Sequence, residues 1–252
     1  MSQSDAHIVI LGAGHAGGTA AALLRQYGHA GPITLVGEEP IPPYQRPPLS
    51  KAWLKGEADA DSLALKPLEF YAEHNIDFRP NVRAEALARS DKSVKLSNGD
   101  TLSYDVLIIA TGMRPIRLPI EGADLGGVLT LRTAADAEAI KAALGPGKRL
   151  VIVGGGYIGL EVAASARALG AEAVVLEREA RILARSACEP LSNFFRDYHI
   201  SRGVEFVLGA SVSGFIGEGG QVSGVRLADG RVVACDVVLL GVGATPNDEI
   251  AR

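Results

Sequence analysis

The stretch KRLVIVGGGYIGLEVAASARALGAEAVVLE, residues 148–177, decides the fold. It begins with an apolar run rich in valine, which is typical of a buried parallel strand. The turn GGGYIG follows, and an alanine-rich segment then predicts a helix that ends at Gly170, before a second apolar strand. A strand, a glycine turn, a helix and a strand within about 30 residues predict a mononucleotide-binding βαβ unit.

The N-terminal part of the chain has the same pattern. HIVIL ends in Gly12, GHAGGTAAALLRQYG predicts a helix closed by Gly28, and PITLVG predicts the next strand. The repeat extends further, because NGDTLSYDVLIIATG at 98–112 resembles DGRVVACDVVLLGVG at 229–243. Each copy starts with a hairpin signal and contains an Asp that opens an apolar strand. The sequence therefore predicts an α/β fold of two duplicated, Rossmann-like three-layer domains.

Each glycine turn matches the pattern G-x-G-x-x-G. The first glycine permits a tight turn, the second lets the backbone approach a pyrophosphate, and the third lets helix and strand pack closely. The pyrophosphate then lies on free N–H groups at the helix N-terminus, where the dipole favours an anion by roughly 0.3–1 kcal/mol. The alternative is a pair of glycine turns without ligands. Two turns in βαβ context favour two dinucleotide sites, which suggests a flavin that stays and a nicotinamide that visits.

Acidic residues follow the second strand of each unit. They are Glu38 and Glu39 in the first and Glu177 in the second, where a carboxylate accepts hydrogen bonds from the adenosine ribose. An exposed surface glutamate is the alternative. Glu177 favours NAD over NADP, because a 2′-phosphate about 4 Å away would be repelled by roughly 1–4 kcal/mol. Three arginines follow closely and would oppose that preference: Arg178, Arg181 and Arg185.

Composition excludes several classes of protein. The 252 residues carry a net charge of -4, which gives no general attraction to nucleic acid or to anionic lipid. No apolar run is long enough to span a membrane, and no secretory signal opens the sequence, so a cytoplasmic location is expected. The two cysteines, Cys188 and Cys235, form no metal-binding or redox pair, and we expect no metal site.

These motifs resemble the pyridine-nucleotide-dependent flavoprotein reductases of the pyridine nucleotide-disulphide oxidoreductase superfamily, and among them the FAD-dependent ferredoxin, rubredoxin and putidaredoxin reductases. The resemblance covers essentially the whole chain. It is carried by ILGAGHAG, PYQRPPLSK, YDVLIIATGMRPIRLPIEGADLGGV, LRTAADA, VIVGGGYIGLEVAASARALG, VVLEREARILAR and GVGATPN. PYQRPPLSK and LRTAADA are the more specific motifs, whereas the glycine turns are shared across the superfamily.

The resemblance implies two cofactor sites. FAD would be bound by Gly12, Gly14, His15, Ala16, Gly17, Glu38 or Glu39, Arg46, Lys51, Ala84, Ala110, Thr111, Gly112 and Arg132. NAD, with NADP less favoured, would be bound by Gly154, Gly156, Tyr157, Ile158, Gly159, Glu161 and Glu177, and Gly243 is a further cofactor-binding position. Lys51 near the isoalloxazine and Glu161 near the nicotinamide are the implied catalytic residues, the alternatives being a surface lysine and a helix-surface charge.

The resemblance also implies a division into domains. An FAD-binding domain would cover 1–116 with a returning segment at 241–252, and an NAD-binding domain would cover 117–240. The family normally continues past GVGATPN into a second flavin-binding segment and a C-terminal interface domain. This sequence ends at Arg252, so the interface domain is expected to be absent from it.

The implied activity is transfer of hydride from NADH to FAD, then of single electrons to a small iron–sulfur protein of ferredoxin or rubredoxin type that serves an oxygenase. Relatives that reduce disulfides carry cysteine near the flavin, whereas PYQRPPLSK has none. Alternatives are a reductase of monodehydroascorbate or of nitrite-reductase machinery, an apoptosis-inducing-factor-like protein acting through partners, and a chain without catalytic activity. The oligomeric state is left open.

The stretch PPYQRPPLSK at 42–51 has no counterpart after VVLE in the second unit. It is either a stiff surface linker or a wall around a cofactor. Because prolines restrict the backbone, the wall would suit a lysine that meets the flavin at one position. The asymmetry predicts that the first site keeps its cofactor and the second exchanges it.

Overall fold

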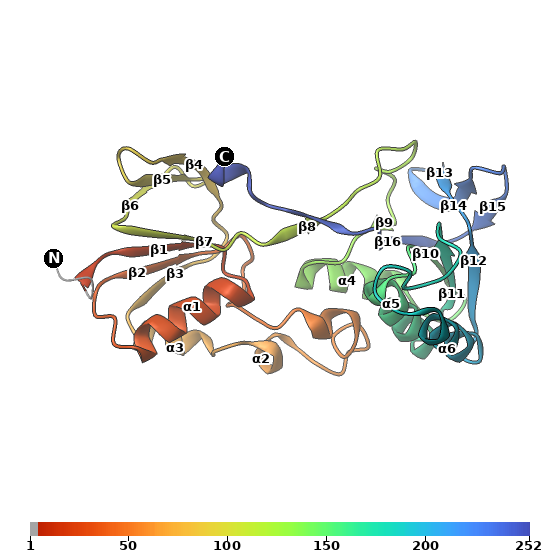
Figure 1. Ribbon diagram of the computed structural model, residues 1–252, viewed down its shortest axis with the longest axis horizontal. Helices are drawn as coiled ribbons and strands as arrows, with labels where there is room; N and C mark the ends of the chain where they lie inside the picture. The colour runs from red at the N-terminus through yellow and green to blue at the C-terminus, as the bar shows by residue number, and fades with distance from the viewer. Residues whose placement is uncertain (1–4) are drawn as a thin grey trace. The chain divides into compact units, whose positions relative to one another are not determined.

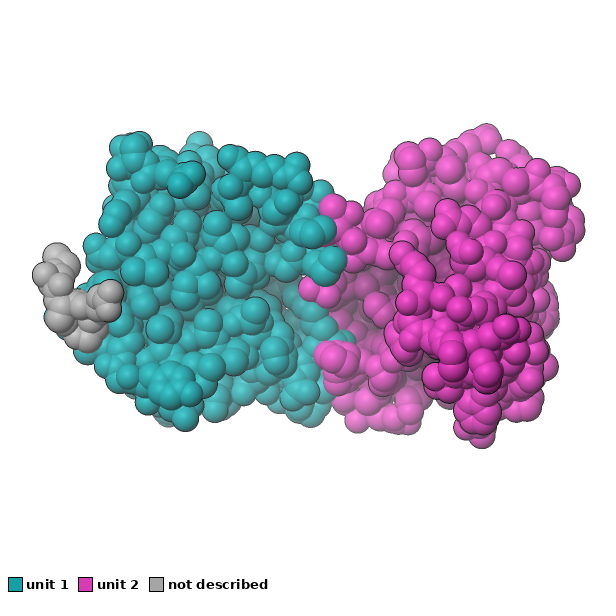
Figure 2. Space-filling model, in the orientation of Figure 1, with its two compact units in different colours: residues 1–46, 59–114, 246–252 teal, residues 47–58, 115–245 magenta. Residues whose placement is uncertain are grey.

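The computed structural model describes residues 5–252, which form two compact units (Figures 1 and 2). The first unit takes in the chain up to Arg46 together with residues 59–114 and 246–252. The second takes in residues 47–58 and 115–245. The chain passes from one unit to the other at four places, and two of these lie in a pair of bonded strands, β8 (Met113–Pro115) and β17 (Ala244–Pro246).

The first unit is built on a parallel sheet in the order β3-β2-β1-β7. Along its central strand, Ile8 and Ile10 pack in a cluster with Ala21 of helix α1, while Val9 and Leu11 pack in a cluster with Leu96 of a small antiparallel sheet. This alternation places helices on one face and the small sheet on the other. The strands are β1 (Ile8–Leu11), β2 (Ile33–Val36), β3 (Ile76–Arg79), β4 (Ala84–Ala88), β5 (Ser93–Leu96), β6 (Thr101–Ser103) and β7 (Val106–Ile109), and the helices are α1 (His15–Gln26), α2 (Ala60–Leu63), α3 (Leu68–Glu73) and the 3₁₀ turn η3 (Glu249–Ala251).

The second unit repeats this plan with the strand order β12-β11-β10-β16-β9. Val151 and Val153 of its central strand pack against Phe215 and Val225 of a second antiparallel sheet. The strands are β9 (Val128–Leu129), β10 (Arg149–Val153), β11 (Glu172–Glu177), β12 (Val204–Leu208), β13 (Val212–Glu218), β14 (Gln221–Leu227), β15 (Val232–Ala234) and β16 (Val237–Leu240). The helices are the 3₁₀ turn η2 (Pro47–Ser50), α4 (Ala134–Ala143), α5 (Tyr157–Ala168) and α6 (Glu189–Ile200).

The predicted mixed α/β fold with parallel sheets is confirmed. The two sheets also match in register, since Leu11 lies opposite Val36 where Val153 lies opposite Leu176. Among residues 5–252, no helix has the length and apolar character needed to cross a bilayer.

The repeated aspartates do the same structural work in both units. Asp105 Oδ2 accepts the backbone N–H of His7, and Asp236 Oδ2 accepts that of Arg149, each at 2.8 Å. Each aspartate also donates its own N–H back to the same residue's carbonyl at 2.9 Å. The pair of bonds satisfies the backbone at the start of each central strand, which explains why both copies retain an Asp there.

The units differ from the predicted domain ranges at residues 47–58, 115–116 and 241–245, which all lie with the second unit. Residues 47–58 lie with the second unit, whereas the sequence placed them in a domain at 1–116. The reason is local packing, because Ser50 is buried and its carbonyl accepts the hydroxyl of Ser165 on α5 at 2.7 Å. The division into an FAD-binding and an NAD-binding domain stays a prediction.

Replacing Asp236 by Asn tests the strand-start contact. The Arg149 N–H holds the pKa of Asp236 below its ordinary value. Because the pKa of Asp236 is lower in the folded state, its carboxylate stabilises the fold at pH values above its unfolded-state pKa of about 3.9. This stabilisation is lost as the pH falls through the folded-state pKa. We expect Asp236→Asn to lower the free energy of unfolding by about 0.5–1.5 kcal/mol at pH 7, and the difference to shrink below about pH 4.

Urea unfolding followed by circular dichroism, at pH 7 and below about pH 4, measures the effect. Asp124→Asn is the control, since Asp124 is exposed and accepts no hydrogen bond from the described residues. An equal loss of stability in the two variants would contradict the assigned contact.

Candidate functional site

The first glycine turn follows β1 and is shaped by close packing. Gly12 has φ +107°, and a Cβ there would lie 2.2 Å from the carbonyl oxygen of Ala110. A Cβ on Gly17 would lie 1.9 Å from the carbonyl oxygen of Gly12. Gly14 is different, because the nearest atom to its added Cβ would be Nη2 of Arg46 at 3.8 Å. The first and third glycines are therefore required by the fold, whereas the second leaves open space.

The second turn repeats this geometry. An added Cβ would lie 2.5 Å from the Gly241 carbonyl oxygen at Gly154, which has φ +112°, and 2.2 Å from the Gly154 carbonyl oxygen at Gly159. At Gly156 it would meet no atom of the described residues within 4 Å. The fold needs no glycine here, so the open space is a cradle of the kind that a pyrophosphate requires.

The helices that follow the two turns leave their N-termini free for an anion. Among the described residues, neither α1 nor α5 has a side-chain cap or an acidic residue in its first turn. His15, Ala16, Tyr157 and Ile158 begin these helices and are exposed. Uncapped N–H groups and an unopposed dipole suit a phosphate. The residues present at both turns fit a dinucleotide.

Each glycine turn also lies where the strand order of its sheet reverses. β2 and β7 flank β1, and β11 and β16 flank β10. Ligands of open parallel sheets bind at this point, outside the carboxyl ends of the strands. Ala110, Thr111 and Gly112 follow β7, and the N–H of Ala110 bonds the Leu11 carbonyl at 2.7 Å. Gly243, with φ +118°, is the matching position after β16.

The turn after β7 is held by Asn247, which the sequence analysis did not single out. Asn247 Nδ2 donates to the Thr111 carbonyl at 2.9 Å, and its backbone N–H donates to the Gly112 carbonyl at 2.9 Å. The Thr111 hydroxyl donates to the Asn247 carbonyl. The signal was present, because the quoted motif GVGATPN ends on this residue.

The two candidate ribose acceptors of the first unit have different surroundings. Glu39 accepts the Tyr44 hydroxyl and Nη2 of Arg46, both at 2.6 Å, so each of its oxygens is engaged. Glu38 is exposed. Which of the two accepts the ribose stays a prediction, while the bond from Arg46 to Glu39 holds the guanidinium beside Gly14.

Ala84 begins β4, two residues after Val82. The N–H of Val82 donates to the Gly37 carbonyl at 2.9 Å, so the residues just before β4 lie beside the segment that carries Glu38. An adenine site on this backbone stays a prediction.

Glu177 already has a structural role in the second turn. Its Oε2 accepts the N–H of Gly155 at 2.6 Å, and its Oε1 accepts the N–H of Glu179 at 2.8 Å. By strand register the first unit has Gly37 at this position, where an added Cβ would lie 2.5 Å from the Cβ of Ala13. The first unit cannot hold a side chain there, which explains why its acidic residues come later.

The arginines after Glu177 are not equivalent. Arg181 donates to the carbonyls of Ala184 and Ala187 and to the Ser192 hydroxyl, so it stabilises its own loop. Arg178 is exposed and pairs with Glu179 at 3.3 Å. Arg181 is therefore engaged within its own loop. Arg178 and Arg185 remain as the arginines that we expect to attract a 2′-phosphate.

The two predicted catalytic residues lie together in the second unit. Nζ of Lys51 is 2.7 Å from Oε2 of Glu161 and donates to the Pro47 carbonyl at 3.1 Å. The Ser50 hydroxyl donates to the same glutamate oxygen at 2.6 Å. The side chains of Lys51 and Glu161 are 48% and 31% exposed, so the pair is accessible to a ligand. We call Ser50, Lys51 and Glu161 the ionic cluster.

Arg132 and the two cysteines are not members of the ionic cluster. Arg132 precedes α4 in the second unit, with its backbone N–H on Oδ2 of Asp136 at 2.8 Å, and its predicted contact with FAD stays a prediction. Cys188 is exposed at the start of α6. Burial raises the pKa of the Cys235 thiol to about 12, which makes it a packed, unreactive side chain.

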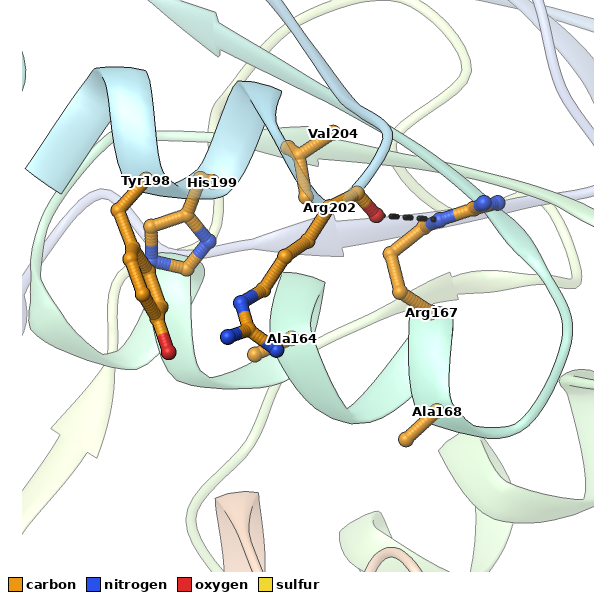
Figure 3. Close-up of a pocket in the computed structure, with 7 residues that line it drawn as sticks. All are labelled: Ala164, Arg167, Ala168, Tyr198, His199, Arg202 and Val204. Carbon is orange, nitrogen blue, oxygen red and sulfur yellow. Dashed lines mark hydrogen bonds between the residues drawn. The ribbon is translucent and has the colours of Figure 1, made fainter.

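A separate hollow of about 380 Å³ lies between α5 and α6 (Figure 3). The Arg202 guanidinium lies 4.3 Å from the centre of the Tyr198 ring, and Nε of Arg167 donates to the Arg202 carbonyl at 3.3 Å. The hollow adjoins the C-terminal half of α5, whereas the glycine turn is at its N-terminus. Cations at helix C-termini are stabilising, so these arginines have a structural explanation.

Comparison with known proteins identifies the family. The family model for pyridine nucleotide-disulphide oxidoreductases matches residues 6–252. The chain belongs to this family. The predicted membership of the chain in this family is confirmed, and the matched residues include both glycine turns and the ionic cluster.

Individual relatives agree. The chain is 49% identical over 248 residues to the probable ferredoxin reductase CtmF of Castellaniella defragrans, covering 98% of this chain and 61% of the relative. It is 42% identical to rhodocoxin reductase of Rhodococcus erythropolis, covering 97% and 57%. The crystal structure of the ferredoxin reductase for the CYP199A2 system from Rhodopseudomonas palustris matches with a TM-score of 0.93 at 40% identity, covering 97% and 60%. The chain thus spans about three fifths of the length of these relatives.

The different roles of the glycines can be tested in the second turn. Gly159→Ala should lower the free energy of unfolding by about 3 kcal/mol, because its Cβ meets a backbone oxygen that must shift. Gly156→Ala should cost about 1 kcal/mol or less, since φ is −83° and the space is open. Urea denaturation of both variants measures the difference. Equal costs would show that the middle glycine is also a packing requirement.

Proposed function

We propose that this chain is the nucleotide-binding part of an NADH-dependent flavoprotein reductase that delivers electrons singly to a small iron–sulfur protein of ferredoxin or rubredoxin type. The observation that carries the proposal is the pair of glycine turns, each with an open middle glycine and an uncapped helix behind it. FAD, when bound, accepts two electrons from the nicotinamide and passes them on one at a time. One dinucleotide site per unit is what such a reaction requires.

The first unit would hold the resident FAD. The open space at Gly14 and the free N-terminus of α1 would receive its pyrophosphate, with the Arg46 guanidinium close by. Glu38 would accept its ribose hydroxyls. Asn247 fixes the turn at Thr111 and Gly112, so that this backbone is preorganised on the other side of β1.

The second unit would hold the exchanging nucleotide. Gly156 and the N-terminus of α5 would receive the pyrophosphate, and Glu177 would accept the adenosine ribose while it continues to hold the loop at Gly155. Glu161 would face the nicotinamide end with Lys51 paired to it. Tyr157, which is 55% exposed at the start of α5, would cover the nucleotide.

The nature of the acceptor is supported by two observations. The similar proteins are named ferredoxin, rubredoxin and putidaredoxin reductases. Neither cysteine adjoins the ionic cluster in the sequence, and Cys235 is buried, so a dithiol relay of the kind used to reduce disulfides has no residues here. Delivery to an oxygenase system fits a relative named as a component of a biphenyl dioxygenase system.

The visible spectrum tests this function directly. The protein reconstituted with FAD should show flavin absorbance that bleaches when NADH is added anaerobically. Colour should return on addition of an oxidised ferredoxin, with reduction of that ferredoxin in parallel. A colourless protein that cannot be loaded with FAD would refute the proposal. Slow turnover with every acceptor, together with an NADH-dependent change of oligomeric state, would favour the alternative of a protein that acts through partners.

The nicotinamide preference can be tested at Glu177. We propose that NADH is preferred over NADPH, because the carboxylate would repel a 2′-phosphate. Glu177→Gln should lower the ratio of NADH affinity to NADPH affinity about tenfold, which corresponds to about 1.4 kcal/mol. Glu172→Gln is the matched control, since Glu172 begins β11, at the other end of the strand from Glu177, pairs with Arg149 there and should leave the ratio nearly unchanged. An unchanged ratio in Glu177→Gln would assign this carboxylate to loop support alone.

A further inference from the structure

Glu161 receives its two hydrogen-bond donors on one oxygen. The Ser50 hydroxyl and the Lys51 ammonium both lie on Oε2, at 2.6 and 2.7 Å. Oε1 accepts no hydrogen bond from the described residues. A carboxylate has about four acceptor positions, so one face of this group is saturated and the other is open.

The donors come from a segment that is fastened to α5 at two points. Ser50 donates its hydroxyl to Glu161, while its carbonyl accepts the hydroxyl of Ser165 at 2.7 Å. Ser50 and Ser165 are each 4% exposed. Glu161 and Ser165 are four positions apart on the helix, so they lie on the same face. The two bonds therefore fix Ser50 against one stripe of α5.

The lysine alone would not orient the glutamate. Lys51 is half exposed and has a long flexible stem, and an ammonium has no directional preference between carboxylate oxygens. A buried hydroxyl is a short, directional donor, and its bond to an ionised acceptor is stronger than a neutral one. Ser50 is thus the group that decides which oxygen of Glu161 is turned inward.

We propose that Ser50 is a positioning residue for nicotinamide recognition, which holds Oε2 of Glu161 so that Oε1 is presented to the carboxamide N–H of the visiting nucleotide. This inference rests on the proposed function of the second unit. Glu161 lies one helical turn from the glycine turn at Gly156, at the end of α5 where the nucleotide would bind. Ser50 would act through Glu161, without contact to the nucleotide.

The test compares two ligands that differ only in the nicotinamide. NADH and ADP-ribose share the adenosine and the pyrophosphate, and only NADH has a carboxamide. Affinities for both can be measured by calorimetry, with fluorescence of Trp53 as a second readout, since Trp53 is the one tryptophan of the sequence and is buried close to Ser50 along the chain. Ser50→Ala should weaken NADH binding about fivefold to tenfold and leave ADP-ribose binding within twofold of the wild type.

Ser165→Ala is the matched control. It removes a buried hydrogen bond of the same segment and leaves the donor to Glu161 in place, so it should lower the melting temperature while the ratio of the two affinities stays within twofold of the wild type. Glu161→Gln is a second variant with the same expectation as Ser50→Ala. Its single amide oxygen would be taken by Ser50 and Lys51, and its amide nitrogen cannot accept a hydrogen bond.

The possible outcomes distinguish the positioning role of Ser50 from the proposed function of the chain. A ratio of the two affinities that is unchanged in Ser50→Ala overturns the positioning role, whatever Glu161→Gln shows, while nucleotide binding stands. An equal change of the ratio in Ser165→Ala would assign Ser50 to packing of its segment and also overturn it. Failure of the wild-type protein to bind either ligand would overturn the proposed function itself.

Discussion

The close approach of two backbones at the end of each central strand determines the rest of this structure. Gly12 passes the Ala110 carbonyl, and Gly154 passes the Gly241 carbonyl, at distances that no Cβ could tolerate. Because the chain turns so tightly, the next helix starts at once and packs on the strand through its own glycine. The N–H groups of that helix are left without a cap and face open space beside the middle glycine. This packing therefore leaves a helix N-terminus that suits an anion.

Duplication preserves this arrangement and changes what surrounds it. In the second unit Glu177 fits beside Gly155 and bonds its N–H. The first unit has Gly37 and Ala13 in the corresponding places, and its carboxylates come after them, with Glu39 turned to Arg46. The two turns share the glycines that close packing requires, and they differ in the acidic side chains around them. This is the pattern expected for two different dinucleotides.

The proline-rich stretch takes on a different meaning in the structure. Its first part, up to Arg46, lies with the first unit, and its second part, from Pro47, lies with the second. The prolines restrict the backbone on both sides of this boundary. The half that carries Lys51 is fastened to α5 by Ser50 and Ser165, so the lysine is part of the unit with the second glycine turn. The predicted wall around the first cofactor stays a prediction.

Sequence reasoning reached the features that depend on local pattern. The strands, the glycine turns and the equivalence of Asp105 and Asp236 in the two repeats all follow from periodicity and spacing. It could not reach contacts between residues far apart in the chain, such as Ser50 with Glu161 and Asn247 with Thr111. Glu38 and Glu39 could not be separated either, because neighbouring residues differ only in which way the fold turns them. The packing of residues 47–58 was missed because a polar contact of Ser50 decides it.

The central claim is that each unit binds its own dinucleotide at its own glycine turn, and a pair of alanine variants tests it most directly. FAD retention after gel filtration and ADP-ribose affinity of the FAD-loaded protein would be measured in the wild type, in Gly14→Ala and in Gly156→Ala. The account predicts that Gly14→Ala loses FAD, whereas Gly156→Ala keeps FAD and loses ADP-ribose. Both variants losing the same ligand, or neither losing any, would contradict it.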